Sequence, residues 1–221
     1  MKIAHVSDLH GNLLPIPYQA NIIINSGDWL PDCGSLWSKQ NVKSERQKEY
    51  FYKNIEKIVP WIKGKPYYFI NGNHDFIDSE ELERILRTNG ISAYSLEDKI
   101  VSHENMTMYG FPWVPYINGS FNYELTPLDM EKKVKELIGV LDNNVIDVLV
   151  LHCPIKNELS SEGFDDYGNN ILENHIKKLD KSKIPGLILC GHLHEAKGIK
   201  YSNILESLVV NSATTCNIIE Y

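Results

Sequence analysis

The stretch PYYFINGNHD, residues 66–75, contains an apolar run followed at once by a polar turn. The apolar run is typical of a buried strand, and the residues from Ser79 onward are typical of a helix. Loops that a rigid sheet holds at strand ends are the usual place for binding and catalytic residues. Gly72 is expected to give this turn a backbone shape that other residues resist. The alternative is an ordinary polar turn that contains His74.

Polar side chains also follow four other predicted strands. Asp8 and His10 follow the predicted strand 2–6, and Asp28 follows the strand 20–25. His152 follows the strand 145–151, and His192 and His194 follow the strand 187–190. Residues two apart in extended chain project to the same side, so Asp8 and His10 face one point. The remaining histidines, His5, His103 and His175, lack this context and are expected to be packing or surface residues.

Between these strands the apolar spacing predicts four helices and several further strands. The helices are expected over 44–63, with Ser44 as N-cap, and over 79–89, 128–141 and 171–179. Runs at 91–94, 99–102 and 107–111 are expected to form adjacent antiparallel strands, and the tail adds strands at 199–201, 205–210 and 217–221. Residues 112–121 form a loop rich in proline and aromatics, which is either packed on itself or a wall beside a substrate. Packing is favoured because aromatic residues in ordered loops mostly pack.

Composition and charge exclude several classes of protein. The chain has 221 residues, 43% of them hydrophobic, which predicts one domain over 1–221. The net charge of -7 disfavours a nucleic-acid polymer as partner. No apolar run reaches the roughly 18–20 residues that cross a bilayer, so no membrane partner is expected. Four widely spaced cysteines and no secretion signal predict a cytoplasmic protein with reduced thiols.

The donors at the strand ends suit divalent metal ions. Carboxylate, amide and imidazole ligands in one place are typical of Mn, Fe, Zn or Ni sites. The candidate metal ligands are Asp8, His10, Asp28, Asn73, His152, His192 and His194. Seven donors are too many for one ion that keeps open positions, and they fit two ions that share a carboxylate.

These blocks, in this order, resemble those of the calcineurin-like metallophosphoesterase superfamily over essentially the whole chain. The blocks are DLH at 8–10, GD at 27–28, GNHD at 72–75, His152 and GHLH at 191–194. One branch of the superfamily, the metallophosphoesterase-domain-containing proteins of the phosphodiesterase type, contains runs similar to four further stretches of this chain. These stretches are residues 110–115, 118–119, 191–195 and 211–216. The resemblance implies an α/β fold, a four-layer α/β/β/α sandwich of two mixed sheets flanked by helices.

The resemblance also implies a role for each residue. Asp8, His10, Asp28 and His194 would hold one ion, and Asp28, Asn73, His152 and His192 would hold the other. Asp28 would bridge the two divalent ions, for which manganese is the first expectation. A hydroxide between the ions would attack phosphorus in line. His74 would bind no metal and would be the catalytic residue that protonates the leaving oxygen.

The chain departs from the protein-phosphatase members of this superfamily. Those members carry an aspartate three residues and an arginine four residues beyond the bridging aspartate, where this chain has Pro31 and Asp32. Without the arginine that grips a phosphomonoester, a small phosphodiester substrate is expected, such as a nucleotide. The alternatives are a phosphomonoesterase or protein phosphatase, a nuclease, and a metal-binding scaffold without turnover. The group that orients His74 stays open between Asp32 and Asp75.

Overall fold

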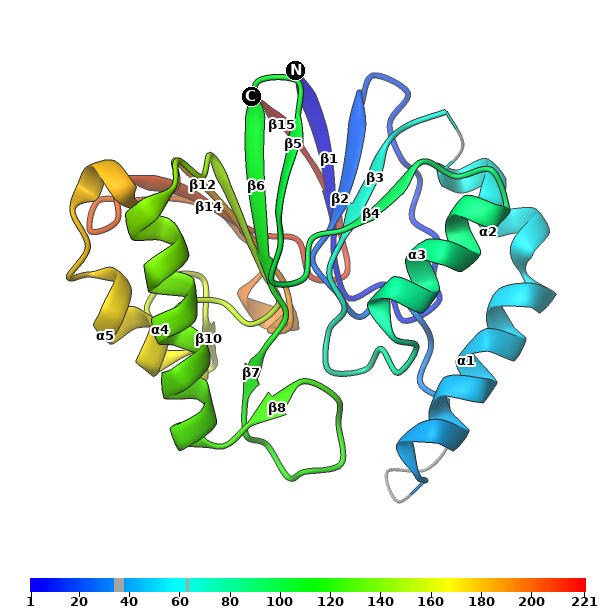
Figure 1. Cartoon of the computed structure of the whole chain (residues 1–221), viewed down its shortest axis with the longest axis horizontal. Helices are drawn as coiled ribbons and strands as arrows, with labels where there is room; N and C mark the ends of the chain where they lie inside the picture. Colours follow the sequence, from blue (N-terminus) through cyan, green and yellow to red (C-terminus); the bar gives the residue numbers. More distant parts are fainter. Residues whose placement is uncertain (34–37, 63) are drawn as a thin grey trace.

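The computed structural model describes residues 1–33, 38–62 and 64–221. Two large sheets stand side by side in the middle of the molecule, with helices on both outer faces (Figure 1). The described helices are α1 (Gln40–Lys53), α2 (Ile55–Ile62), α3 (Ser79–Thr88), α4 (Pro127–Asn143) and α5 (Asn170–Ile176). This arrangement confirms the predicted four-layer α/β/β/α sandwich.

The first sheet has the strand order β15-β1-β2-β3-β4. Its strands are β1 (Lys2–Val6), β2 (Ile22–Asn25), β3 (Tyr67–Phe69), β4 (Ala93–Ser95) and β15 (Cys216–Glu220). β1 to β4 pair in parallel, and β15 pairs antiparallel with β1. The carboxyl ends of β1, β2 and β3 therefore meet at one edge, which is the edge where the polar turns lie.

The second sheet has the strand order β13-β14-β12-β9-β6-β5. Its strands are β5 (Ile100–His103), β6 (Met106–Phe111), β9 (Val148–Leu151), β12 (Leu187–Cys190), β13 (Gly198–Ser202) and β14 (Ser207–Asn211). β6, β9, β12 and β14 run parallel. The minor elements are β7 (Val114–Pro115), β8 (Glu124–Leu125), β10 (Ser161–Glu162), β11 (Asp165–Asp166) and the short 3-10 helices η1 (Lys181–Lys183) and η2 (His194–Ala196).

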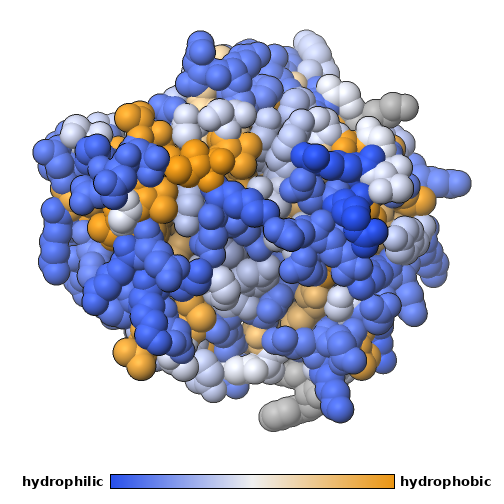
Figure 2. Space-filling view, in the orientation of Figure 1, coloured by the Kyte–Doolittle hydropathy of each residue, from blue (hydrophilic) through white to orange (hydrophobic). Residues whose placement is uncertain are grey.

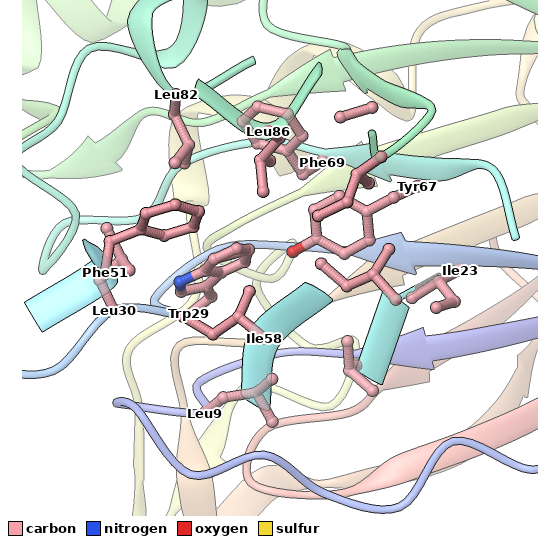
Figure 3. Packing of buried hydrophobic residues seen from close by; sticks show 14 of the residues in the cluster. Leu9, Ile23, Trp29, Leu30, Phe51, Ile58, Tyr67, Phe69, Leu82 and Leu86 are labelled. Carbon is pink, nitrogen blue, oxygen red and sulfur yellow. The ribbon is translucent and has the colours of Figure 1, made fainter. Parts of the chain in front are cut away.

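Three hydrophobic clusters fill the spaces between the four layers. The cluster in Figure 3 joins side chains of α1, α2 and α3, such as Phe51 and Leu82, to Tyr67 of the first sheet. A second cluster packs α4 and α5 on the second sheet. A third, with Ile24 and Val150, lies between the two sheets. Because the central strands are covered on both faces, their sequences are continuous apolar runs, which is why they could be recognised.

The predicted helix over 44–63 is wrong in its limits. It begins four residues earlier, at Gln40, so Ser44 is not its N-cap, and it breaks at Asn54 into α1 and α2. The Asn54 side-chain amide donates to the carbonyl of Tyr50 at 2.9 Å, and the Asn54 carbonyl accepts from Ile58. Asn54 therefore ends one helix and starts the next in a new direction. The predicted last residue, Lys63, lies outside the described residues.

The predicted antiparallel group of 91–94, 99–102 and 107–111 is correct only for the last two runs. β5 and β6 pair antiparallel, but β4 belongs to the first sheet, parallel to β3. The chain crosses between the sheets at Leu96. Its N–H donates to Phe69 of the first sheet at 2.8 Å, and its carbonyl accepts from Gly110 of the second at 3.1 Å.

The outer surface shown in Figure 2 is mainly hydrophilic, with separate hydrophobic patches. Within the described part of the chain, no helix has the length and apolar composition that crossing a membrane requires.

Candidate metal centre

The turns after five strands of the two sheets bring the predicted ligands together. The structure contains two sets of three donors, and within each set the ligand atoms lie within 4.8 Å of one another. One set is Asp8, His10 and His194, and the other is Asp28, His152 and His192. Asn73 joins the second set, because its Oδ1 lies 3.0 Å from Nε2 of His152. All seven residues thus lie in these two groups, with Asp28 grouped only with His152 and His192, whereas the resemblance implied it in both. Their binding of metal stays a prediction.

Several of these residues have left-handed backbones that non-glycine residues rarely adopt. The φ angles of Asp8, His10, Asp28 and His192 are 53°, 44°, 52° and 68°. Hydrogen bonds between the first two turns hold this shape, because the N–H of Asp8 donates to Gly27 and the N–H of His10 to Asp28, each at 2.9 Å. Such backbone strain is characteristic of functional sites, where the surrounding structure enforces it.

Gly72 serves the site by its small size and not, as the sequence suggested, by a special backbone shape. Its φ is not positive. A Cβ added there would lie 2.2 Å from Oδ1 of Asp28 and 2.5 Å from Cε1 of His152. The turn after β3 therefore packs directly against two predicted ligands, and only glycine leaves room for both.

Replacement of Gly72 by alanine is expected to displace Asp28 and His152 and to lower metal affinity by about 10-fold to 100-fold. Gly139→Ala is the matched control. An added Cβ at Gly139 meets nothing within 4 Å, and this position lies within α4, where alanine adds about 0.5–1 kcal/mol of stability. Isothermal titration with Mn²⁺ measures both variants. Equal affinity in the two would contradict the packing role of Gly72.

The carboxylates and His192 already have the charge states that suit metal binding, whereas two other donors do not. Burial alone would raise the pKa of Asp28, but His152, whose Nε2 lies 3.2 Å from its carboxylate, holds that pKa well below the ordinary range. The Asp8 carboxylate lies 3.3 Å from Nε2 of His194, and its pKa is also lowered against the effect of burial. Burial lowers the pKa of His192 to about 4. Ionised carboxylates and neutral imidazoles are the forms that ligate metals. Burial would lower the pKa of His152, but Asp28 raises it to about 9, and the bond to Asp8 raises the pKa of His194, so a metal ion bound at either imidazole would displace a proton.

Two further observations fit a pair of bound ions. Nδ1 of His10 is buried and has no hydrogen-bond partner among the described residues. The Nδ1–H of His152 donates to the carbonyl of Ser26 at 2.8 Å, which turns Nε2 toward Asn73 and Asp28. An imidazole fixed through its other nitrogen in this way is typical of metal-ligating histidines.

His74 lies at the edge of the two sets, in contact with a different carboxylate. Its Nδ1 bonds Asp32, and its ring lies 4.8 Å from that of Phe121 and 5.0 Å from that of His10. His10, Asp32 and His74 also form a third donor group within the same 4.8 Å limit. Burial tends to lower the pKa of His74, but the bond to Asp32 raises it above its ordinary value. Of the two candidates, Asp32 is the residue that orients His74.

Asp75, which the sequence left unassigned, braces the turn that carries Asp28. One carboxylate oxygen accepts from the N–H groups of Asp28 at 2.7 Å and Gly72 at 2.9 Å, and the other accepts from Leu30 at 3.0 Å. The side chain is buried, and burial raises its pKa to about 7. Asp75 thus ties the turn after β3 to the turn after β2.

Sequence reasoning also missed Gln47, a buried residue of α1. Its amide donates to the carbonyl of His74 at 2.7 Å and accepts from the N–H of Phe76 at 2.7 Å. Gln47 therefore supports the turn that carries His74. Its position in an amphipathic helix gives no local signal of this contact.

The remaining histidines and cysteines lie outside the donor sets. His5 is buried between the hydroxyls of two serines, and burial lowers its pKa to about 3. His103 contacts Tyr68, and His175 contacts Glu131. The four cysteines all belong to the described residues, and none forms a disulfide there. Cys153, next to His152, is a buried thiol whose pKa burial raises to about 12, so it is protonated and is not a nucleophile.

Comparison with known proteins places this site in a family. A search of curated proteins gave no match. Solved structures of similar fold include TT1561 of Thermus thermophilus, at 15% identity and a TM-score of 0.58, covering 95% of this chain and 88% of that one. A proposed 5'-nucleotidase of Staphylococcus aureus, in complex with alpha-ketoglutarate, is 15% identical with a TM-score of 0.53. The match covers 95% of this chain and 48% of that one. GAP50, the anchor in the inner membrane complex of Plasmodium, is 13% identical with a TM-score of 0.50. The match covers 96% of this chain and 71% of that one.

At these identities the likeness shows the fold alone. The family model of calcineurin-like phosphoesterases matches residues 1–196 of the chain. Members of this family generally use a pair of divalent metal ions, and the two donor sets support such a metal-dependent phosphoesterase. The chain belongs to the calcineurin-like phosphoesterase family.

Proposed function

We propose that the protein is a phosphodiesterase that hydrolyses a small phosphodiester with the help of two divalent ions. The observation that carries this proposal is the pair of carboxylate and imidazole sets gathered around the ends of the central strands. Asp8, His10 and His194 would hold one ion, and Asn73, His152 and His192 the other. A carboxylate can bind two ions at once, and of the two carboxylates, Asp8 and Asp28, the resemblance to the family assigns Asp28 to both ions, so Asp28 is the proposed bridge.

The ions would supply positive charge to the phosphate and would lower the pKa of the attacking water. The chain's own contribution is to hold the donors in place. Oδ1 of Asn73 lies 3.0 Å from Nε2 of His152, so the two atoms converge on one point, and the N–H of the next residue donates to Oδ1 of Asp28 at 2.7 Å. Manganese is our first choice for both ions, since mixed oxygen and imidazole donors accept it, as they accept iron, zinc or nickel.

His74 is proposed to donate a proton to the leaving oxygen. An alkoxide is a poor leaving group, and an acid with a pKa near neutrality can protonate it as the bond to phosphorus breaks. Nδ1 of His74 is occupied by Asp32, so Nε2 is the nitrogen that can face the substrate. Asp32 therefore acts as a positioning residue that fixes the ring, and its bond raises the pKa of His74 against the effect of burial.

A diester is favoured over a monoester because Asp32 stands where protein phosphatases carry the arginine that grips a phosphomonoester. Arg84 and Arg87 lie on α3 and pair with Glu81 and Glu83 of the same helix. Arg46 is exposed on α1. A phosphodiester carries one negative charge fewer than a monoester and depends less on such a clamp.

The preference can be measured with bis(p-nitrophenyl) phosphate and p-nitrophenyl phosphate on the manganese-loaded protein. We expect kcat/KM for the diester to exceed that for the monoester by at least about tenfold, or about 1.4 kcal/mol. A preference for the monoester would instead favour a phosphomonoesterase, the activity that the name of the Staphylococcus aureus neighbour suggests for that protein.

A further inference from the structure

Beside the second donor set lies a cavity that the proposed reaction leaves without a use. Its volume is about 370 Å³, within the range of small-molecule sites. It is lined by Pro115, Tyr116, Ile117, Glu162, Tyr167, His192 and Leu193. His192 belongs to both the cavity and the donor set, and its ring centroid lies 5.0 Å from that of His152. A molecule in this cavity would therefore border the metal centre.

Besides His192 and Leu193, the walls come from two separate segments, each of which carries an exposed tyrosine. Tyr116 and Ile117, which follow β7, are 57% and 47% exposed, and Tyr167, which follows β11, is 55% exposed. Large apolar side chains exposed together around a cavity mark a binding site. Tyrosine rings can stack on a planar group, and stacking on an aromatic ring contributes about 1–3 kcal/mol per nucleobase.

The polar group of this cavity is the carboxylate of Glu162. One of its oxygens accepts from the backbone N–H of Glu195 at 3.5 Å, and the other has no hydrogen-bond partner among the described residues. A carboxylate accepts hydrogen bonds and repels lone pairs. It therefore selects a ring that carries an amino group over one that presents only carbonyl oxygens or ring nitrogens.

We propose that this cavity binds the nucleobase of a nucleotide substrate, with the ring against Tyr116 and Tyr167 and an amino group donating to Glu162. The inference rests on the proposed function, since it names the organic substituent of the phosphate that the metal centre cleaves. For residues 112–121, where the sequence favoured packing, the proposal makes part of the loop a wall of the substrate site.

Equilibrium binding tests the ring site without any turnover. Adenosine 5'-monophosphate and ribose 5-phosphate carry the same phosphate and differ in the base. On the metal-loaded protein, titration calorimetry should give a dissociation constant at least about tenfold lower for the nucleotide. Adenosine should also bind more tightly than purine riboside, which lacks the amino group.

The variants Tyr116→Ala and Tyr167→Ala should each remove most of the preference for the nucleotide, and Glu162→Ala should remove the preference for adenosine over purine riboside. Tyr201→Ala is the matched control, because Tyr201 is 58% exposed on β13 and does not line the cavity. All four side chains lie at the surface or on short elements, so the variants are expected to fold.

The two proposals fail separately. If both phosphates bind equally well, or if the tyrosine variants behave like Tyr201→Ala, the nucleobase site is wrong even when diester hydrolysis proceeds. If the nucleotide preference depends on these tyrosines but no diester is hydrolysed, the nucleobase site stands and the phosphodiesterase activity is wrong. Equal binding of adenosine and purine riboside would remove the role of Glu162.

Discussion

Replacement of His74 by alanine is expected to lower kcat for a phosphodiester by about 10²-fold to 10⁴-fold while the metal content stays unchanged. The reason is geometric. His74 contacts Asp32 and Phe121 and is not needed to complete either predicted ligand set. The variant therefore loses the proton donor but keeps the donors that bind the ions. Initial rates and metal analysis by mass spectrometry on the same preparation measure the two effects together.

His175→Ala is the control for this variant, because His175 bonds Glu131 on the outer helices. It should leave both rate and metal content unchanged. A loss of metal in His74→Ala would show that His74 is itself a ligand, in line with the third donor group it forms with His10 and Asp32. An unchanged kcat would remove its role as the acid.

The pH dependence gives a separate test of Asp32. The bond from Asp32 raises the pKa of His74, although burial acts in the opposite direction. A proton donor works below its pKa, and its contribution is lost as the pH rises through that value. Since Asp32→Asn removes the raising effect, the alkaline fall of kcat should move to lower pH. A profile that keeps its position would show that Asp32 does not position the acid.

Replacement of Asp28 by asparagine is the second change with a large expected effect, because this residue is the proposed bridge between the ions. An amide does not bridge two cations, so we expect metal affinity to fall by more than about 100-fold and turnover to be lost with it. Thermal unfolding provides a readout besides activity. Manganese at 100 times its dissociation constant should stabilise the parent protein by about 2.7 kcal/mol. The variant at the same concentration should gain little.

Asp142→Asn, on the exposed side of α4, controls for the loss of one negative charge. It should bind metal and respond to manganese like the parent. If Asp28→Asn kept the full thermal response, the two donor sets would bind their ions independently, and the bridge would be wrong.

The sequence predicted the central strands, and it placed the candidate ligands at their ends, because both depend on patterns that are local. The apolar runs that became β1, β2, β3, β9 and β12 are covered on both faces, and each polar turn follows its strand directly. The parallel arrangement then gathers the turns at one edge, as expected of an α/β fold.

What the sequence could not predict depends on distances between separate segments. Asp32 and Asp75 are both near the site in sequence, and only the folded chain shows that the former contacts His74 and the latter the backbone of Asp28. The helical period continues through Asn54, so nothing in the pattern marked the break between α1 and α2. The sequence also did not indicate to which sheet β4 belongs, because a short strand does not specify its partner.

The contact between Asp8 and His194 has a consequence for the order in which the protein is made. The two residues stand 186 positions apart, and the second donor set likewise needs His152 and His192 from late in the chain. During synthesis, the amino-terminal turns emerge long before their partners. The second donor set is incomplete until residue 192 has left the ribosome and the first until residue 194 has, and both need the second sheet to dock on the first. Loading of the proposed metal ions would therefore be a late event, and an interrupted chain that ends before residue 192 would lack predicted ligands from both sets.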